Sequence, residues 1–329
     1  MPAILSGRHT RANLLLLLAS AIWGFAFVAQ RVGAQYVGPF TFNAVRFALG
    51  ALVVLAVIAW RSVTAKHPVA AVKRRQAWRA VLGPGIAAGL FLTVASALQQ
   101  GAMSTVPAGN AAFITGLYMV FVPVIAAFRG HRSSVSTVLG VVSSVIGLYL
   151  IAVTDAFTIG FGEVLLIIST LAWTGQILVI DHYGARLSAL RFAVVQFVTC
   201  SLLSVPAAFV AEPAPFTGLD QAAIPLLYGG LLSVGVAFTL QVVGQRDALA
   251  SHASLIMAME SVFGALGGAL FLGESMTLRG YLGAALMITG VVVAQLGAVH
   301  ASRAAKPVEL EPSGQRPAIT PDAETPPRL

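Results

Sequence analysis

The stretch Ala253–Glu274, ASLIMAMESVFGALGGALFLGE, is apolar over a length that can cross a bilayer, yet Glu260 lies well inside it. In a helix that rises ~1.5 Å per residue, this carboxylate would lie about a third of the way into a hydrocarbon core roughly 30 Å thick. An ionisable group at that depth is costly unless it faces a cavity, a partner or a proton. Two interpretations fit this position: a glutamate satisfied by a neighbouring side chain, or a glutamate with a role inside the membrane.

Small residues accompany this glutamate at spacings of three and four, namely Ser261, Gly264, Ala265, Gly267, Gly268 and Ala269. Stripes of small residues let the backbones of neighbouring membrane helices approach closely. The stretch therefore predicts a helix that offers both a packing surface and a buried ionisable group.

Composition places the rest of the chain in a membrane as well. Hydrophobic residues make up 57% of the 329 positions and charged residues 10%, against ~25% charged residues in soluble domains. The mean hydropathy is +0.86. The single cysteine, Cys200, lies in an apolar run and cannot form a disulfide framework within the chain. These values indicate an integral membrane protein.

Hydropathy and helix-breaking residues divide the chain into ten apolar segments. They cover residues 13–31, 41–60, 80–100, 106–128, 134–152, 161–180, 189–209, 223–244, 253–272 and 280–299. We therefore expect an all-α membrane protein with ten transmembrane helices.

An internal repeat relates the two halves of the chain. At a shift of 150 residues Leu14–Ala34 aligns with Val164–Gly184, so that Trp23 meets Trp173. At a shift of 142 residues Gln99 aligns with Gln241, and Tyr118 aligns with Glu260. Each copy has five spans, an odd number, so the second copy enters the membrane from the opposite side. Two inverted repeats are typical of secondary transporters, whose binding site lies between them near the midplane.

The repeat also sets the expected boundaries. We predict a cytoplasmic N-terminus over residues 1–12, a first five-helix repeat over 13–152, a second over 160–299, and a disordered cytoplasmic tail over 300–329, which is rich in proline. The first helix resembles a signal peptide, but its internal copy indicates that it is retained.

Charge predicts the orientation. If both termini are cytoplasmic, all but three of the 20 Lys and Arg residues fall on the cytoplasmic side; the exceptions are Arg31, Arg46 and Arg279. This asymmetry follows the positive-inside rule and indicates the inner (cytoplasmic) membrane. The net charge of +8 is therefore a topology signal, and the basic residues face the anionic lipid of the bilayer. The charge does not indicate nucleic-acid binding.

Polar and aromatic residues inside the spans are candidates for a substrate site. Arg46 is either a structural anchor or a clamp for a substrate carboxylate, and pairing with Glu260 is a third option. The two aligned tryptophans either pack in the core or form an aromatic cavity wall. The glutamines either join helices or line a polar cavity. The candidate set is Trp23, Arg46, Gln99, Tyr118, Trp173, Gln176, Gln241 and Glu260.

Glu260 is also the candidate for proton coupling, because burial favours the neutral form of a carboxyl group. No metal site and no cofactor are expected, since no Cys/His pair or phosphate-binding loop is present. The same absence of a catalytic constellation argues against an intramembrane enzyme.

The pattern resembles the drug/metabolite transporter superfamily, in its ten-helix branch with two EamA-type domains. The resemblance covers roughly residues 12–299 and rests on LLLLLASAIWGFAFVAQR, PFTFNAVRFALGAL, AAFITGLYMVFVPVIAAFRG and SLIMAMESVFGALGGALFLGESMTLRGYLGAALMITGVVVAQ. Ser261 stands where the family often has proline. The resemblance implies a transporter of amino acids, nucleosides, drugs or other small metabolites.

We therefore expect a secondary transporter that exports amino acids or related small metabolites by alternating access, with possible proton coupling. The expected partners are a small-molecule substrate, lipid and protons, in a monomer or a homodimer. The alternatives are an uncoupled facilitator, a lipid flippase or an intramembrane enzyme. Amino-acid character is suggested by the amides, the two tryptophans and the arginine.

Overall fold

The computed structural model describes residues 2–64, 71–128, 130, 133–152, 160–273 and 278–304, and these residues form helices without a strand. The helices are α1 (Pro2–Gly33), α2 (Pro39–Val63), α3 (Ala71–Ala102), α4 (Ala108–Gly116), α5 (Tyr118–Phe128), α6 (Val135–Ala152), α7 (Phe161–Gly184), α8 (Ala189–Ala211), α9 (Ala223–Leu227), the π-helix η1 (Tyr228–Phe238), α10 (Thr239–Gly244), α11 (Ala250–Met257), α12 (Glu260–Phe271) and α13 (Leu278–Ala304).

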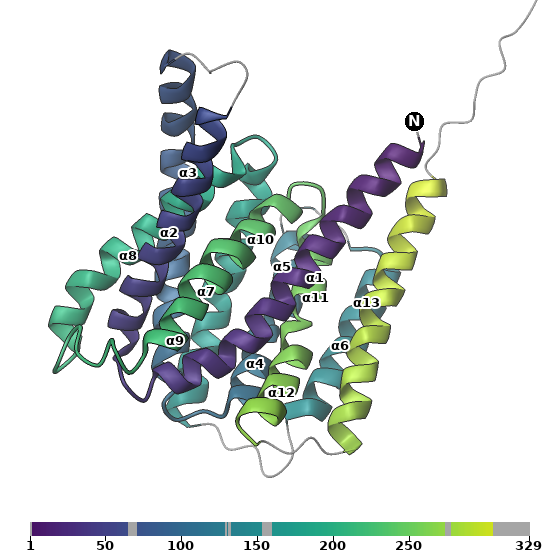
Figure 1. Cartoon of the computed structure of the whole chain (residues 1–329). Helices are drawn as coiled ribbons and strands as arrows, with labels where there is room; N and C mark the ends of the chain where they lie inside the picture. The colour runs from purple at the N-terminus through teal and green to yellow at the C-terminus, as the bar shows by residue number, and fades with distance from the viewer. Residues whose placement is uncertain are drawn as a thin grey trace, which may run out of the picture.

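The helices run alternately up and down through one bundle (Figure 1). We call the end that holds the turn between α1 and α2 the lower end, and the end at which α2 finishes and α3 begins the upper end. Within the described residues nine helical stretches are long and apolar enough to cross a membrane, and Val135–Leu150 is a shorter apolar helix. The all-α membrane fold is therefore confirmed.

The helices at both termini extend beyond the predicted spans. The first begins at Pro2, inside the segment predicted as a separate N-terminus. The last continues to Ala304, five residues into the predicted tail. The rest of that tail lies outside the described residues.

Two predicted spans are each interrupted by a tight turn. The span 106–128 breaks at Leu117 between α4 and α5, and the span 253–272 breaks at Ala258 and Met259 between α11 and α12. Leu117 and Met259 each donate a backbone hydrogen bond three residues back, of 3.2 and 3.1 Å, which is the pattern of a 3₁₀ turn. Both breaks fall at positions that the 142-residue shift aligns.

Neighbouring helices supply hydrogen bonds near the first break. The Thr170 hydroxyl donates to the Ile114 carbonyl at 3.0 Å, and the Ser261 hydroxyl donates to the Ala112 carbonyl at 2.8 Å. Side chains of this kind stabilise an interrupted helix inside a membrane, where water cannot satisfy the backbone.

A third interruption is the long π-helix η1, which follows α9. Two hydrogen bonds join it to α1: the Tyr228 hydroxyl donates to the Ile22 carbonyl at 2.9 Å, and Trp23 Nε1 donates to the Ser233 carbonyl at 3.2 Å. π-helical turns occur frequently at functional sites.

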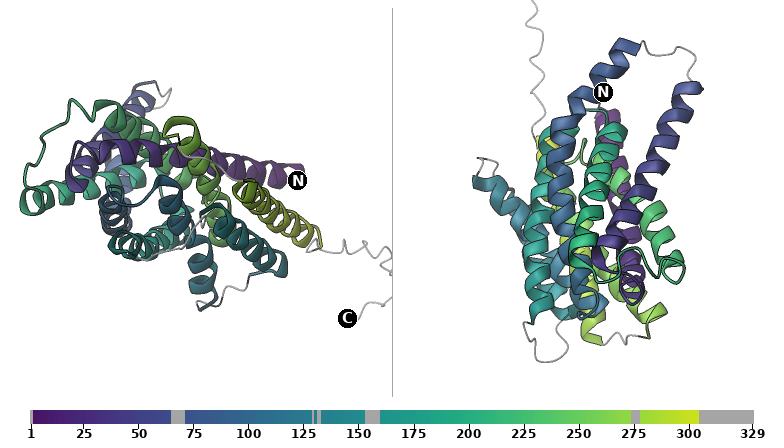
Figure 2. Two further views of the ribbon diagram at one scale, coloured as in Figure 1. Left: turned by 90° about the horizontal axis from the view of Figure 1, so that it is seen from below. Right: turned by 90° about the vertical axis from the view of Figure 1, so that its left-hand side faces the viewer.

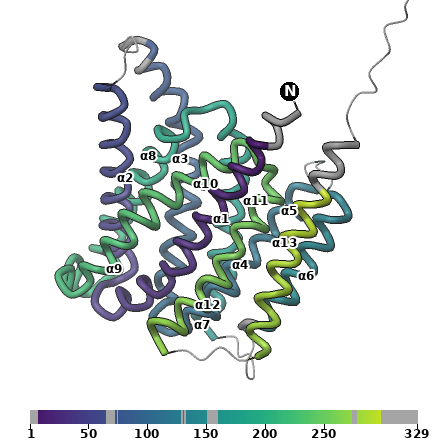
Figure 3. The backbone as a smooth tube through the Cα atoms, turned by 45° about the vertical axis from the view of Figure 1, so that its right-hand side comes forward, coloured from purple at the N-terminus to yellow at the C-terminus, as the bar shows by residue number. Residues whose placement is uncertain are grey.

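Close packing joins distant parts of the chain. The first helix lies against α12, α3 lies against α7 and α8, α2 lies against α8 and η1, and α6 lies against α13. Figures 1 and 3 show α6 and α13 side by side at one edge of the bundle. At the contact between α1 and α12, a Cβ on Gly24 would lie 2.3 Å from Phe263 Cβ, so only glycine fits there.

The lower end is held by polar contacts across the halves of the chain. The Glu212 carboxylate, which follows α8, accepts from the backbone N–H groups of Phe40 and Thr41 at 2.6 and 3.0 Å. These are first-turn donors of α2, which have no partner within their own helix. Figure 2 shows the connection after α8 beside the α1–α2 turn.

Candidate functional site

A cavity lies among the interrupted helices in the interior of the bundle. It is lined by Trp23, Phe27, Gln30, Arg46, Gln99, Thr115, Tyr118, Trp173, Ile177, Ser233, Phe238, Gln241, Met257 and Glu260. About 40 Å³ is open to the centres of water-sized molecules, whereas one water needs ~10–15 Å³. In this conformation the cavity therefore holds a small group or a few waters.

The structure brings seven of the eight predicted site residues to this cavity. The exception is Gln176, which is fully buried and lies behind Gln241, with which it exchanges hydrogen bonds of 3.1 and 3.3 Å. The set draws on α1, α2, α3, α5, α7, α10 and α12, and so on both halves of the chain.

Three aromatic rings form the centre of one wall. Phe238, the last residue of η1, lies 4.7 Å from the Trp23 ring and stacks on the Trp173 ring at 5.7 Å with an interplanar angle of 20°. Hydrogen bonds fix both indoles, because Trp23 Nε1 donates to the Ser233 carbonyl and Trp173 Nε1 donates to Gln99 Oε1 at 2.9 Å. The wall thus offers flat apolar faces of fixed orientation.

Arg46 is buried at the cavity. Its side chain is 3% exposed, its Nε donates to Asn43 Oδ1 at 2.9 Å, and its guanidinium lies 5.3 and 4.9 Å from the Phe42 and Phe47 ring centres. It forms no ion pair with Glu260. The guanidinium is therefore held by neutral groups, which leaves its charge available to an anion.

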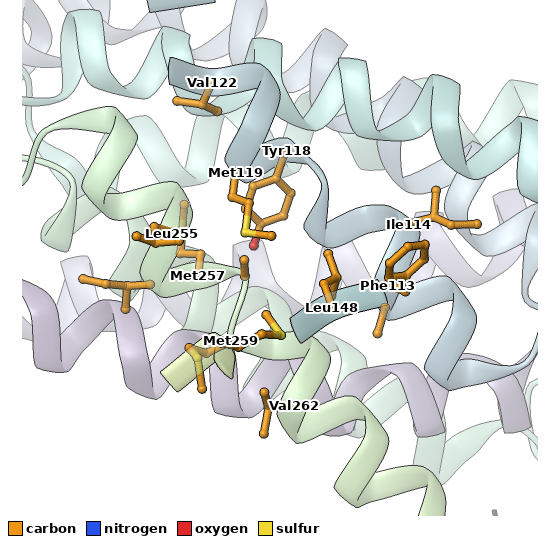
Figure 4. Packing of buried hydrophobic residues seen from close by; sticks show 14 of the residues in the cluster. Phe113, Ile114, Tyr118, Met119, Val122, Leu148, Leu255, Met257, Met259 and Val262 are labelled. Atoms are coloured by element: carbon orange, nitrogen blue, oxygen red, sulfur yellow. The ribbon is translucent and has the colours of Figure 1, made fainter. Parts of the chain in front are cut away.

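The sequence predicts that Glu260 lies inside a continuous helix. In the structure it is instead the first residue of α12. The Tyr118 hydroxyl lies within reach of its carboxyl group, and Figure 4 shows that hydroxyl directed toward the segment that carries Met257 and Met259. Neither the hydroxyl nor Glu260 Oε1 has a partner with hydrogen-bond geometry. These buried atoms keep hydrogen-bonding capacity that a solute or water can use.

Amide side chains line both ends of the cavity. Toward the lower end, Gln99 Nε2 donates to Gln30 Oε1 at 3.0 Å. Toward the upper end, Gln241 pairs with Gln176, whose Nε2 also donates to Gln196 Oε1 at 3.2 Å. Amides present both donors and acceptors, so the cavity suits a solute with mixed hydrogen-bonding groups.

Sequence reasoning missed Phe27, Gln30, Thr115, Ile177, Ser233, Phe238 and Met257, which also line the cavity. Gln30 carries the same signal as Gln99, a glutamine in an apolar span. The apolar residues carry no such signal, because their types are as common in the core as at a cavity. In the described ranges no three His, Cys, Asp or Glu side chains form a metal-binding group.

Comparisons with known proteins agree on the type of protein. The chain is 27% identical over 289 residues to an uncharacterized transporter of Archaeoglobus fulgidus, and the match covers 87% of this chain and 86% of the relative. It is 23% identical over 286 residues to the uncharacterized transporter YoaV of Bacillus subtilis, and this match covers 84% of this chain and 94% of the relative.

One solved crystal structure has a similar fold, with a TM-score of 0.69. Its sequence is 20% identical to this chain, and the match covers 89% of this chain and 99% of that chain. The model of the EamA-like transporter family matches residues 10–153 and again residues 160–295. The chain is thus a multi-pass membrane transporter that handles a small-molecule substrate in a lipid bilayer, and it belongs to the EamA-like transporter family.

Proposed function

We propose that the chain is a secondary transporter that exports amino acids or related small metabolites across the cytoplasmic membrane by alternating access. The observation that carries the proposal is the cavity, which combines an unneutralised guanidinium, a carboxyl group, amides and an aromatic wall. A zwitterionic solute with an apolar side chain matches each of these groups.

In this proposal, the two inverted repeats produce the alternating access. The breaks at Leu117 and at Ala258–Met259 fall at aligned positions, and interrupted helices around a central site are a feature of inverted-repeat transporters. The chain works as a monomer or a homodimer with both termini in the cytoplasm.

Glu260 is the proposed proton-coupling group. It is 5% exposed, borders the cavity and has an unpartnered Oε1 beside the Tyr118 hydroxyl. A group whose access to water changes between two conformations changes its proton affinity with them, which couples proton entry to solute exit.

Transport by purified protein in proteoliposomes tests the proposal. Labelled amino acids are offered with and without a pH gradient, and efflux or exchange of at least one of them is expected. Glu260→Gln should keep exchange of solute for solute but lose the response to the gradient, while Glu163→Gln serves as the matched control. Glu163 bonds the Gly160 N–H at 3.0 Å, at the start of α7.

Three results separate the alternatives. Transport without any effect of the pH gradient indicates an uncoupled facilitator. Activity on labelled lipids or nucleotide sugars but on no amino acid refutes the substrate class. A Glu260→Gln variant with wild-type gradient dependence refutes the coupling role alone.

A further inference from the structure

Two equivalent pairs of cavity residues are in different hydrogen-bonded states. Trp173 Nε1 donates to Gln99 Oε1 at 2.9 Å. The aligned pair is Trp23 and Gln241, and here the corresponding bond is absent. Trp23 Nε1 donates to the Ser233 carbonyl at 3.2 Å, and Gln241 Oε1 accepts from Gln176 Nε2 at 3.3 Å.

The surroundings of the two pairs correspond. Gln99 stands three residues before the end of α3, and Gln241 stands three residues before the end of α10. The tryptophan helix lies against the glutamine helix in both cases, α7 on α3 and α1 on α10. All four side chains border the cavity, so the missing bond needs an exchange of partners and not a new fold.

The rest of each glutamine is held in the same way. Gln99 Nε2 donates to Gln30 Oε1 at 3.0 Å, and Gln241 Nε2 donates to Gln176 Oε1 at 3.1 Å. The two glutamines differ only at Oε1. Gln99 Oε1 accepts from the Trp173 indole, whereas Gln241 Oε1 accepts a longer bond from Gln176 Nε2. Gln176 Nε2 also donates to Gln196 Oε1. Gln176 therefore keeps a partner when Gln241 Oε1 is released.

We propose that the transport cycle exchanges these two bonds. The Trp173–Gln99 bond closes the lower end in the conformation described here, and a Trp23–Gln241 bond closes the upper end when the first bond opens. Ser233 and Gln176 hold Trp23 and Gln241 until then, so Trp23 Nε1 and Gln241 Oε1 have a hydrogen-bond partner in both states. The proposal rests on alternating access in the proposed function.

Sided thiol labelling tests this exchange without a transported solute. The background carries Cys200→Ala, and Met257→Cys serves as reporter because Met257 borders the cavity and makes none of these bonds. A membrane-impermeant thiol reagent is applied to one face of the membrane at a time. Ile177→Cys, also on the cavity, is a second reporter should the first fold poorly.

Gln99→Met and Gln241→Met should shift labelling in opposite directions. Gln99→Met removes the acceptor of the closed lower end, so labelling from the lower face should rise by about five-fold, the effect of one net hydrogen bond on a two-state equilibrium. Gln241→Met removes the acceptor of the other state and should reduce labelling from the lower face. In the double variant, labelling from the lower face should return toward the level of the Cys200→Ala background with the Met257→Cys reporter.

Gln100→Met is the matched control. Gln100 adjoins Gln99, is similarly buried, and donates to the Gln30 carbonyl at 3.0 Å, so its loss costs a bond of the same kind without touching either tryptophan. Labelling that changes equally in Gln100→Met, or that moves in one direction in both test variants, overturns the proposal. Because no solute is used, a wrong substrate class leaves this result valid.

Discussion

The cavity is lined by one basic residue, Arg46, and one acidic residue, Glu260. Their surroundings differ. The guanidinium lies close to two phenylalanine rings and donates to Asn43, so its orientation is fixed by neutral partners. The carboxyl group has an oxygen without a partner. The cation is thus set in place, while the carboxyl group is free to change partner.

Arg46→Lys tests whether this arrangement matters beyond the charge. Lysine keeps the charge but loses the planar group that bonds Asn43 and stacks on the rings, so we expect about a ten-fold loss of transport rate with little change in folded yield. The control is Arg191→Lys, because Arg191 also lies over a ring, that of Trp78 at 5.8 Å, but does not border the cavity. Equal losses in both variants would contradict a specific role.

At the scale of the element, sequence pattern and structure differ at the interruptions. Hydropathy predicts the spans 106–128, 223–244 and 253–272 but not their breaks, because apolar composition is the same in a 3₁₀ turn, a π-helix and an α-helix. The breaks depend on partners from other helices, such as Thr170 on the Ile114 carbonyl. In the structure Tyr118 and Glu260, which the 142-residue shift aligns, each begin the helix after a break.

The small-residue stripe after Glu260 predicts close contacts with neighbouring helices. The contact between α12 and Gly24 of α1 allows this prediction to be tested. A Cβ there would lie 2.3 Å from Phe263 Cβ and 2.7 Å from the Glu260 carbonyl, and overpacking of this kind costs ~1–3 kcal/mol. We expect Gly24→Ala to lower the thermal unfolding midpoint of the detergent-purified protein.

Gly83→Ala is the control for that measurement. Gly83 is in α3, and a Cβ added there would meet no atom within 4 Å, so alanine should be neutral or slightly stabilising through its higher helix propensity. A midpoint of Gly24→Ala equal to that of Gly83→Ala would show that α1 and α12 are less closely packed than described.

At the scale of the whole molecule, the candidate site was largely predictable because polar residues in apolar spans are rare. Trp23, Arg46, Gln99, Tyr118, Trp173, Gln241 and Glu260 all reach one cavity. Gln176 was predicted to bind substrate but lies one layer behind, since periodicity alone does not fix which neighbour separates a side chain from a cavity. Phe238 was missed because its place depends on the π-helix.

The distribution of charge between the two ends of the bundle supports the proposed orientation. Exposed basic residues at the upper end include Arg61, Lys73, Arg75 and Arg79. The two arginines at the lower end are both engaged, since Arg31 donates to the Met103 and Val106 carbonyls at 2.7 and 3.0 Å and Arg279 lies 5.1 Å from the Tyr149 ring centre. Among the described residues, the exposed basic side chains therefore lie at the upper end.

We accordingly expect the upper end to face the cytoplasm. In the Cys200→Ala background, Thr64→Cys at the upper end and Thr217→Cys at the lower end both place a thiol at an exposed position. An impermeant thiol reagent added to intact cells should label Thr217→Cys, whereas Thr64→Cys should react only after the membrane is permeabilised. Labelling of Thr64→Cys in intact cells would reverse the orientation, and with it the direction in which the Trp–Gln exchange opens the cavity.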